Sequence, residues 1–414
     1  MTNMFDRCYE LSQSGNSNAQ YALGTYYKNG IECEKNVDAA KYWFKTSMEN
    51  GNIEAAKEYL QILLDSNNKG ELEQAFMIAN TYAFENDPYF EYSLGVMYRD
   101  GIGIERNLPM CLTWLRKSSD LGYSKATIAL IDILQVSNNQ SDRREAYIIC
   151  KNLAKANNTY AQYRLGIMYL SGIGTKKDEN EAKALLFKSL SNGYPKASVN
   201  LASMSLSDEE NERLYELCSQ YKKDKNATYV VAKLCIDGKI TGKSHDEIID
   251  FLRKSSEMGN SKATIALIDL LIVSANQPDR REAFLLCLPL AKSGNSYAQY
   301  RLAKMYHNGK GTSKNYSECM KWVEKSAIQN NSRAICLYID YLMEDSESDL
   351  SKAVKLCVNS AKKGDKYTQF KLGELYLNGV GVEKDLVESK KWFLKAYQSG
   401  NEKALDYIDG CKDE

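Results

Sequence analysis

Few residues of this sequence have types and spacings suited to catalysis. Its 414 residues include only two histidines, His245 and His307, and neither has a cysteine or carboxylate at the spacing of a zinc site. A hydrolase triad would need one of them as its base, and no G-x-S-x-G turn precedes a helix. The stretches GIGIER and GVGVEK resemble phosphate loops but lack the lysine and serine that such loops use. The sequence therefore predicts a protein that is not an enzyme and holds no metal and no cofactor.

The glycine that opens these loops recurs along the chain at intervals of 66 to 71 residues. Its six positions are Gly30, Gly101, Gly172, Gly238, Gly309 and Gly379. Helical periodicity precedes and follows each of them, so each copy predicts a helix, a loop and a helix. Further along each copy stands another glycine, or Asn330 in the fifth copy, where a helix end needs the left-handed conformation.

All four tryptophans share one position in these copies, thirteen residues after the loop glycine. They are Trp43, Trp114, Trp322 and Trp392, and Leu185 and Phe251 replace them in the other two copies. A large apolar side chain at the same place in every copy predicts a buried structural anchor.

The combined pattern, clearest in the segment AQYRLGIMYLSGIG at residues 161–174, resembles the Sel1-like repeat. A second loop glycine separates this family from the related tetratricopeptide repeat, and it is present as Gly103, Gly174, Gly311 and Gly381. Glu32 replaces it in the first copy, and the copy around Val231 has Cys235 instead of the tyrosine, so we expect irregular loops in both. The resemblance implies an all-α fold, a right-handed α-solenoid of helix-loop-helix repeats.

Strong copies alternate with weaker ones that lack the glycine loop, in pairs of about 70 residues. We expect an N-terminal capping helix in residues 1–16, one continuous solenoid of about eleven repeats over 17–401, and a C-terminal capping helix and tail over 402–414. Residues 124–165 align without a gap to 261–302, which indicates an internal duplication. In this segment Asp142 and Asp279 each precede two arginines and a glutamate, and we favour helix capping over a pair of basic binding sites.

Composition narrows the kinds of partner. The 54 basic and 54 acidic residues balance, so nothing attracts the whole protein to nucleic acid or to an anionic membrane. The eleven cysteines form no C-x-x-C pair and are interpreted as reduced, packed thiols. The N-terminal residues lack a signal-peptide pattern, and no apolar run approaches a membrane span. We therefore expect a cytoplasmic monomer without membrane insertion, while secretion without a cleaved signal stays open.

Two columns of aromatic residues point to the binding face. If the first helix of each repeat lines the concave face, as the resemblance implies, the residues two and five before its leucine face the groove. The inner column, two residues before, contains Tyr21, Tyr92, Tyr163, Tyr229, Tyr300 and Phe370. The outer column, five residues before, contains Tyr89, Tyr160, Tyr297 and Tyr367. Aspartates of three weak copies, Asp132, Asp269 and Asp340, are expected beside them.

Such a groove suits an extended peptide, whose apolar side chains lie on the rings and whose lysines or arginines meet the aspartates. For the inner column, packing between helices is an equal alternative. For the aspartates, solvation or pairing with a neighbouring lysine is an alternative.

Three functions remain after these arguments. The leading one is a non-enzymatic scaffold or adaptor that binds a protein or extended peptide, as the resemblance implies. An accessory module of polysaccharide biosynthesis or carbohydrate binding is the first alternative, because Sel1-like repeats accompany polymerising enzymes and tyrosine stacks on sugars. A bacterial effector or host-interaction factor is the second, since the family includes such proteins. The sequence does not choose among them.

Overall fold

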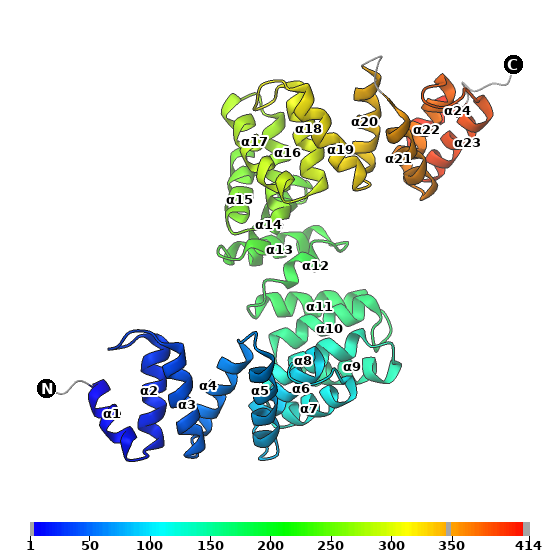
Figure 1. Ribbon diagram of the computed structural model, residues 1–414. Helices are drawn as coiled ribbons and strands as arrows, with labels where there is room; N and C mark the ends of the chain where they lie inside the picture. Colours follow the sequence, from blue (N-terminus) through cyan, green and yellow to red (C-terminus); the bar gives the residue numbers. More distant parts are fainter. Residues whose placement is uncertain (1–3, 345–348, 409–414) are drawn as a thin grey trace. The chain divides into compact units, whose positions relative to one another are not determined.

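A computed structural model describes residues 4–344 and 349–408, and every regular element in these ranges is a helix (Figure 1). This confirms the predicted all-α class. The chain forms two compact units, Met1–Ser189 and Leu190–Glu414, and the boundary falls within α11. One continuous solenoid over 17–401 stays a prediction.

The helices follow one another with short connections. The first unit contains α1 (Met4–Gln13), α2 (Ser17–Asn29), α3 (Val37–Glu49), α4 (Ile53–Leu64), α5 (Lys69–Ala83), α6 (Pro88–Asp100), α7 (Leu108–Asp120), α8 (Ser124–Val136), α9 (Gln140–Lys155), α10 (Thr159–Ser171) and most of α11 (Glu179–Ser191). The second contains α12 (Ala197–Leu201), α13 (Asp208–Gln220), α14 (Lys225–Ile236), α15 (His245–Glu257), α16 (Ser261–Val273), α17 (Gln277–Lys292), α18 (Ser296–Asn308), α19 (Tyr316–Ile328), α20 (Ser332–Met343), α21 (Ser351–Lys362), α22 (Lys366–Asn378), α23 (Leu386–Gln398), η1 (Glu402–Ala404) and α24 (Leu405–Ile408). The predicted capping segments hold α1 and η1–α24, and their residues 1–3 and 409–414 lie outside the described part.

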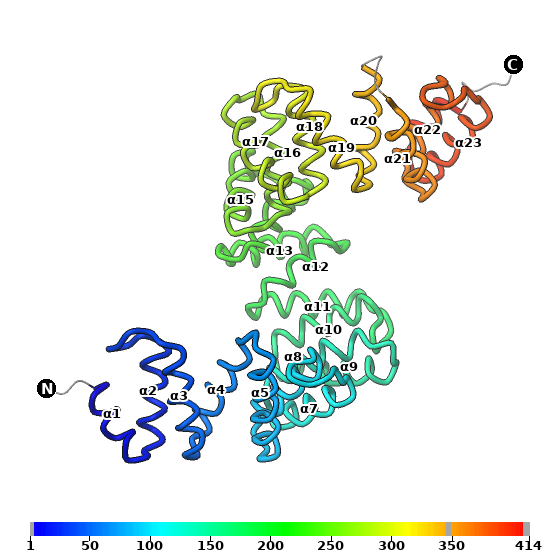
Figure 2. The backbone as a smooth tube through the Cα atoms, viewed as in Figure 1, coloured from blue at the N-terminus to red at the C-terminus, as the bar shows by residue number. Residues whose placement is uncertain are grey.

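Within each unit, a helix packs against its neighbours in the sequence, and the tube in Figure 2 can be followed from one helix to the next. Most helices begin after an asparagine or aspartate whose side chain accepts a backbone N–H of the first turn. Asn158, for example, accepts the N–H of Ala161 at 2.9 Å. These caps satisfy donors that a helix leaves unpaired and fix where each helix starts. The result is an α-solenoid, in which each helix pair buries its apolar face against the next pair.

The strong pairs are held together by a close approach of their two helices. A β-carbon on Gly95 of α6 would lie 2.7 Å from the Leu115 side chain of α7, so glycine is needed for this spacing. The fifth strong copy replaces the glycine with Ala303, and its partner position carries the smaller Val323. The fourth strong copy also carries an alanine, Ala232, but keeps Leu252 at the partner position, so the compensation in volume is confined to the fifth copy.

The predicted loop conformations are present. The first loop glycines have positive φ, from 68° to 75°, and Asn330 has φ 60°, as expected for its substitution. A β-carbon on Gly103 would lie 2.1 Å from the Leu72 carbonyl oxygen of α5, which explains the second loop glycine. The irregular loop predicted at Glu32 is wrong, because Glu32 adopts the same left-handed conformation at φ 56°. Around Val231 the loop does differ, since α14 ends at Ile236 and its C-terminal cap is Asp237 rather than the loop glycine.

Three of the four tryptophans are buried anchors, as predicted. Trp114, Trp322 and Trp392 are 5–7% exposed, and a lysine three residues later covers each ring, at 4.1 Å for Lys395 over Trp392. Trp43 corrects the prediction because it is only half-buried. Its neighbour on one side is the short helix α1, from which Tyr9 contacts the indole edge-on at 6.1 Å. Position 46 is a threonine, so no lysine covers Trp43.

A column of buried glutamines connects successive repeats. Gln299 Nε2 donates to the Ala291 carbonyl at 3.0 Å, and Gln369 Nε2 to the Ala361 carbonyl at 3.2 Å. In the second strong copy this position is Glu91, which is 1% exposed and has an Oε2 atom without a partner. Burial raises the pKa of Glu91, as do Asp87 and Asp120, while Lys117 lowers it. Burial thus disfavours the charged form of Glu91, and an ionised carboxylate could not donate as the glutamines do.

The tryptophan burial predicts a graded loss of stability. Trp392→Ala should lower the free energy of unfolding by about 3–5 kcal/mol, because it opens a cavity in the core. Trp43→Ala should cost less, since that indole is half-buried. Urea unfolding gives the totals, and hydrogen exchange resolved by peptide should show the first loss of protection in α21–α24 for Trp392→Ala. Equal effects of the two substitutions would contradict this account of burial.

Glu91 predicts a pH dependence of stability in the first unit. Because its pKa in the folded chain lies above the ordinary value of 4.5, its stabilising contribution is complete below pH 4.5 and is lost as pH rises through the folded pKa. A glutamine at position 91 has an amide donor at every pH. Glu91→Gln should therefore raise the free energy of unfolding by about 1–3 kcal/mol at pH 8 but little at pH 4.5. Urea unfolding at both pH values measures this difference. A gain of equal size at both would show that Glu91 does not titrate in this range.

Candidate functional site

The aromatic residues of both columns lie between the core and the solvent. All are half-buried except Tyr367, which is 37% exposed. In the inner column, Tyr21 packs against Phe44 with ring centroids 5.7 Å apart, and Tyr92 packs against Tyr123 at 5.3 Å. Each ring gives part of its surface to helix packing and leaves the rest open. This geometry is compatible with both interpretations of the inner column, so the assigned contact residues stay a prediction.

Two of the predicted tyrosine–aspartate pairs form hydrogen bonds and include a cation. The Tyr160 hydroxyl of α10 donates to Asp132 of α8 at 2.8 Å, and Arg164 lies 2.5 Å from the same carboxylate. The same arrangement recurs with Tyr297, Asp269 and Arg301, at 2.7 and 2.8 Å. In both, the aspartate carboxylate joins the first helix of a weak copy to the first helix of the next strong copy.

The third aspartate, Asp340 of α20, pairs with Lys371 of α22 at 2.5 Å, and Lys371 also lies 3.0 Å from Glu374. The Lys371 side chain is 14% exposed, whereas that of Asp340 is 48% exposed. Burial lowers the pKa of Lys371, but the two carboxylates outweigh it and the net direction is upward. Here the outer tyrosine takes another partner, since the Tyr367 hydroxyl accepts a hydrogen bond from Arg333 at 3.2 Å.

The three cations were missed in the sequence, although a signal exists. Arg164, Arg301 and Lys371 stand directly before the repeat leucine, and only in the copies whose preceding weak copy has the aspartate. Each aspartate is thus paired with a cation of the same chain. This agrees with the alternative in which the aspartates hold a neighbouring basic residue. Contact with a partner's lysine or arginine stays a prediction for these aspartates.

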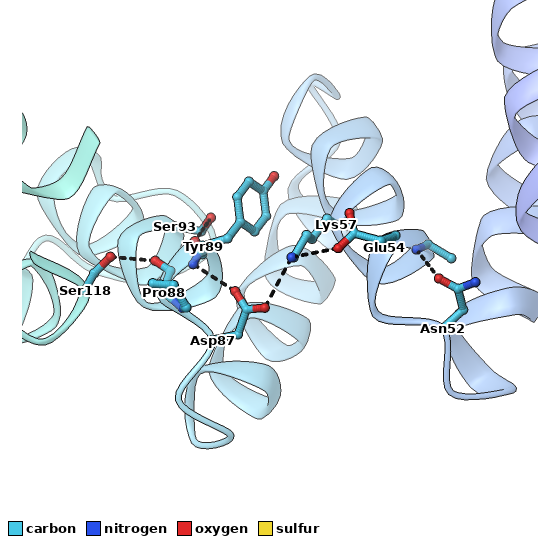
Figure 3. A network of polar contacts seen from close by, with 9 residues as sticks. Asn52, Glu54, Lys57, Asp87, Pro88, Tyr89, Ser93 and Ser118 are labelled. Carbon is cyan, nitrogen blue, oxygen red and sulfur yellow. Dashed lines mark hydrogen bonds and ion pairs between the residues drawn. The ribbon is translucent and has the colours of Figure 1, made fainter. Parts of the chain in front are cut away.

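Tyr89 is held by a different network, shown in Figure 3. Lys57 of α4 lies 2.9 Å from Glu54 and 3.3 Å from Asp87, and Asp87 accepts the backbone N–H of Tyr89 at 2.8 Å. The Lys57 ammonium lies 5.9 Å from the centre of the Tyr89 ring. Burial raises the pKa of Tyr89 to about 12, so its hydroxyl keeps its proton. The position equivalent to Asp132 and Asp269 is Gln61. The triad of tyrosine, aspartate and arginine is therefore absent here.

The structure gathers four of the predicted residues at one place in the second unit. Tyr300, Tyr367, Phe370 and Asp340 line a cavity of about 550 Å³, which we call the C-terminal cavity. Tyr229 and Tyr297 do not line it. In the first unit, Tyr160 borders a separate cavity of about 300 Å³ with several isoleucines. Residues of the two columns therefore line more than one cavity.

Other candidate chemistry is sparse in residues 4–344 and 349–408. They contain no cluster of three or more histidine, cysteine or acidic side chains that could hold a metal. Ten cysteines there are free, and burial raises the pKa of Cys111 to about 11 and that of Cys150 to about 12. Cys411 lies outside the described residues. No helix in the same ranges is long and apolar enough to cross a membrane.

The duplicated arginines are structural. Arg144 donates to the Gly174 carbonyl at 3.2 Å, and Arg281 repeats this with the Gly311 carbonyl at 3.3 Å. The capping role predicted for Asp142 and Asp279 is wrong, because α9 and α17 begin one turn earlier, after Asn139 and Asn276. Both aspartates instead accept a serine hydroxyl at 2.6 Å. Asn139 caps α9 by accepting the backbone N–H of Ser141 at 2.9 Å, whereas Asn276 precedes α17 without a side-chain cap.

The stacked helix pairs, glycine loops and half-buried aromatic columns define a repeat protein of the α-solenoid class. The Sel1 repeat family matches residues 17–52, 88–123, 159–194, 296–331 and 367–401, so the chain contains five Sel1 repeats, as the resemblance in the sequence indicated. The strong copy outside these matches is the one with Cys235 in place of tyrosine. The structure nevertheless forms its helix pair, α14 and α15.

Several known proteins are similar to the chain. The chitin synthase regulator SKT5 of Saccharomyces cerevisiae is 23% identical over 308 residues, which are 72% of this chain and 40% of that protein. An uncharacterised protein of Neisseria meningitidis is 23% identical over 404 residues, covering 86% of this chain and 83% of that protein. The crystal structure of a protective antigen of uropathogenic Escherichia coli with an SLR fold has a TM-score of 0.55 and 22% identity, covering 99% of this chain and 94% of that chain. This last likeness establishes the fold.

The half-buried position of Arg301 beside Asp269 predicts a measurable coupling between the two charges. A double-mutant cycle of Asp269→Ala and Arg301→Ala should give a coupling energy of about 1–2 kcal/mol in urea unfolding, because the pair is partly shielded from water. The pair of Lys233 in α14 and Asp237 at the C-terminal cap of the same helix is more exposed, serves as the control and should give about 0.3–0.5 kcal/mol. Equal coupling in the two pairs would mean that the triad does not stabilise the packing of α16 on α18.

Proposed function

We propose that this chain is a non-enzymatic scaffold that binds an extended segment of a partner protein through the first helices of its repeats. The observation that carries the proposal is the C-terminal cavity, which gathers an exposed tyrosine, two further aromatic rings and an aspartate at the surface of a rigid helix stack. Aromatic side chains that are already ordered provide contact area at small entropic cost. Sel1 repeats support the same role, since they occur in interaction scaffolds. The cytoplasmic location expected from the sequence is part of this proposal.

A second candidate is regulation of polysaccharide synthesis. The similarity to the chitin synthase regulator favours it, because that relative covers 72% of this chain. The chain spans only 40% of the regulator's length, so the activity of the whole relative is not carried over. In this form of the proposal, the bound partner would be a polysaccharide-polymerising enzyme, and the mode of binding would be the same.

Site-specific photo-crosslinking tests the scaffold. Benzoylphenylalanine at position 367, in the cavity, should capture a partner protein in lysate of the source organism. The same residue at Val387, which is 69% exposed on α23 and outside the cavity, is the matched control and should not capture it. Mass spectrometry of the adduct distinguishes a polymerising enzyme from other partners. Identical adducts from both positions, or none from position 367, would count against binding at this face.

A further inference from the structure

The C-terminal cavity has a charge arrangement that the sequence did not indicate. Two cations stand at the ring of Tyr367, with Arg333 5.2 Å and Lys366 5.5 Å from its centre. Arg333 donates to the Tyr367 hydroxyl at 3.2 Å, and Lys366 donates to the Gly400 carbonyl at 3.1 Å. Neither forms an ion pair with a carboxylate of residues 4–344 and 349–408.

Lys371 in the same cavity shows the contrast. Its ammonium is held by Asp340 at 2.5 Å and by Glu374 at 3.0 Å, so these carboxylates are already neutralised in part. A partner's lysine would have to compete with Lys371 for Asp340. An incoming carboxylate, in contrast, would find Arg333 and Lys366 with neutral partners only, and charge-assisted hydrogen bonds of this kind are the stronger ones.

The apolar part of the lining lies beside these cations. Leu337, Phe370 and Tyr300 are half-buried and line the same cavity. Phe370 is fixed by Phe393 at 5.3 Å and by Tyr407 at 5.2 Å between ring centroids. A rigid aromatic surface next to a cationic edge suits a peptide in which an apolar residue follows an acidic one.

We propose that the C-terminal cavity binds an acidic peptide segment, with a carboxylate at Arg333 and Lys366 and the neighbouring apolar side chain against Leu337, Phe370 and Tyr300. The inference rests on the proposed scaffold function and adds the chemistry of the bound segment. It reverses the charge that the aspartates alone suggested. A polyphosphate chain fits less well, because it has no apolar part to place against Leu337, Phe370 and Tyr300 in the same cavity.

Peptide selection on the intact chain tests the proposal. A phage-displayed library of random dodecapeptides is panned on immobilised protein, and the enriched sequences should carry aspartate or glutamate next to leucine or an aromatic residue. The same panning is done with the variant Arg333→Gln, Lys366→Gln. The matched control is Lys362→Gln, Lys363→Gln, which removes the same charge from exposed residues outside the cavity. Circular dichroism confirms that each variant is folded before panning.

Fluorescence anisotropy with the most enriched peptide then gives Kd. We expect Kd to rise about tenfold in the Arg333→Gln, Lys366→Gln variant and to stay unchanged in the control. The reversal variant Arg333→Glu, Lys366→Glu should instead enrich basic peptides.

The outcomes separate the two proposals. Peptides that are enriched but neutral or basic, or whose Kd is the same in all variants, would overturn the acidic ligand and leave the scaffold intact. No enrichment on the unmodified chain would contradict both.

Discussion

The close approach of paired helices is the constraint on which the rest of the structure depends. A helix pair of this size cannot bury its apolar face alone, so each pair needs tight contact within itself and with its neighbours. Gly95 against Leu115 provides the first contact, and Gly103 against the Leu72 carbonyl provides the second. Because both contacts leave no room for a β-carbon, they fix the spacing and the angle of the helices that carry the aromatic columns. The binding face is thus a consequence of the packing.

Features that depend on one residue type at a repeated position could be predicted from the sequence. Loop glycines, Asn330 as a left-handed substitute and three of the four buried tryptophans followed from periodicity, because the same physical demand recurs in each copy. Trp43 was mispredicted since its burial depends on the neighbouring helix, and α1 is short. The caps of α9 and α17 were misplaced for a similar reason. Where each of these helices begins depends on where the preceding turn ends, and both begin before the aspartate.

The charge of the groove could not be predicted from its acidic residues alone. Whether Asp132, Asp269 and Asp340 are open to a partner depends on cations that approach from another repeat, about 30 residues away in the sequence. The pairing is visible only when helices are placed side by side. The two partners of each ion pair are also buried to different degrees, since the cations are 14–22% exposed and the aspartates 32–48%. An aspartate that is exposed at the surface can therefore already be paired with a cation of the same chain.

The difference between strong and weak copies suggests where partner specificity lies. The first helices of strong copies must supply the leucine, the small residue after it and the half-buried aromatic columns, so their surface varies little within the chain. Weak copies are freer, and the weak copy that contains α20 supplies Arg333, Leu337 and Asp340 to the C-terminal cavity. The corresponding residues of α8 and α16 keep the aspartate but replace Arg333 with Lys125 and Lys262. Lysine lacks the planar fork that arginine offers to a carboxylate, so each cavity along the chain would prefer a different segment. A solenoid of similar repeats can in this way carry binding sites that differ from one repeat to the next.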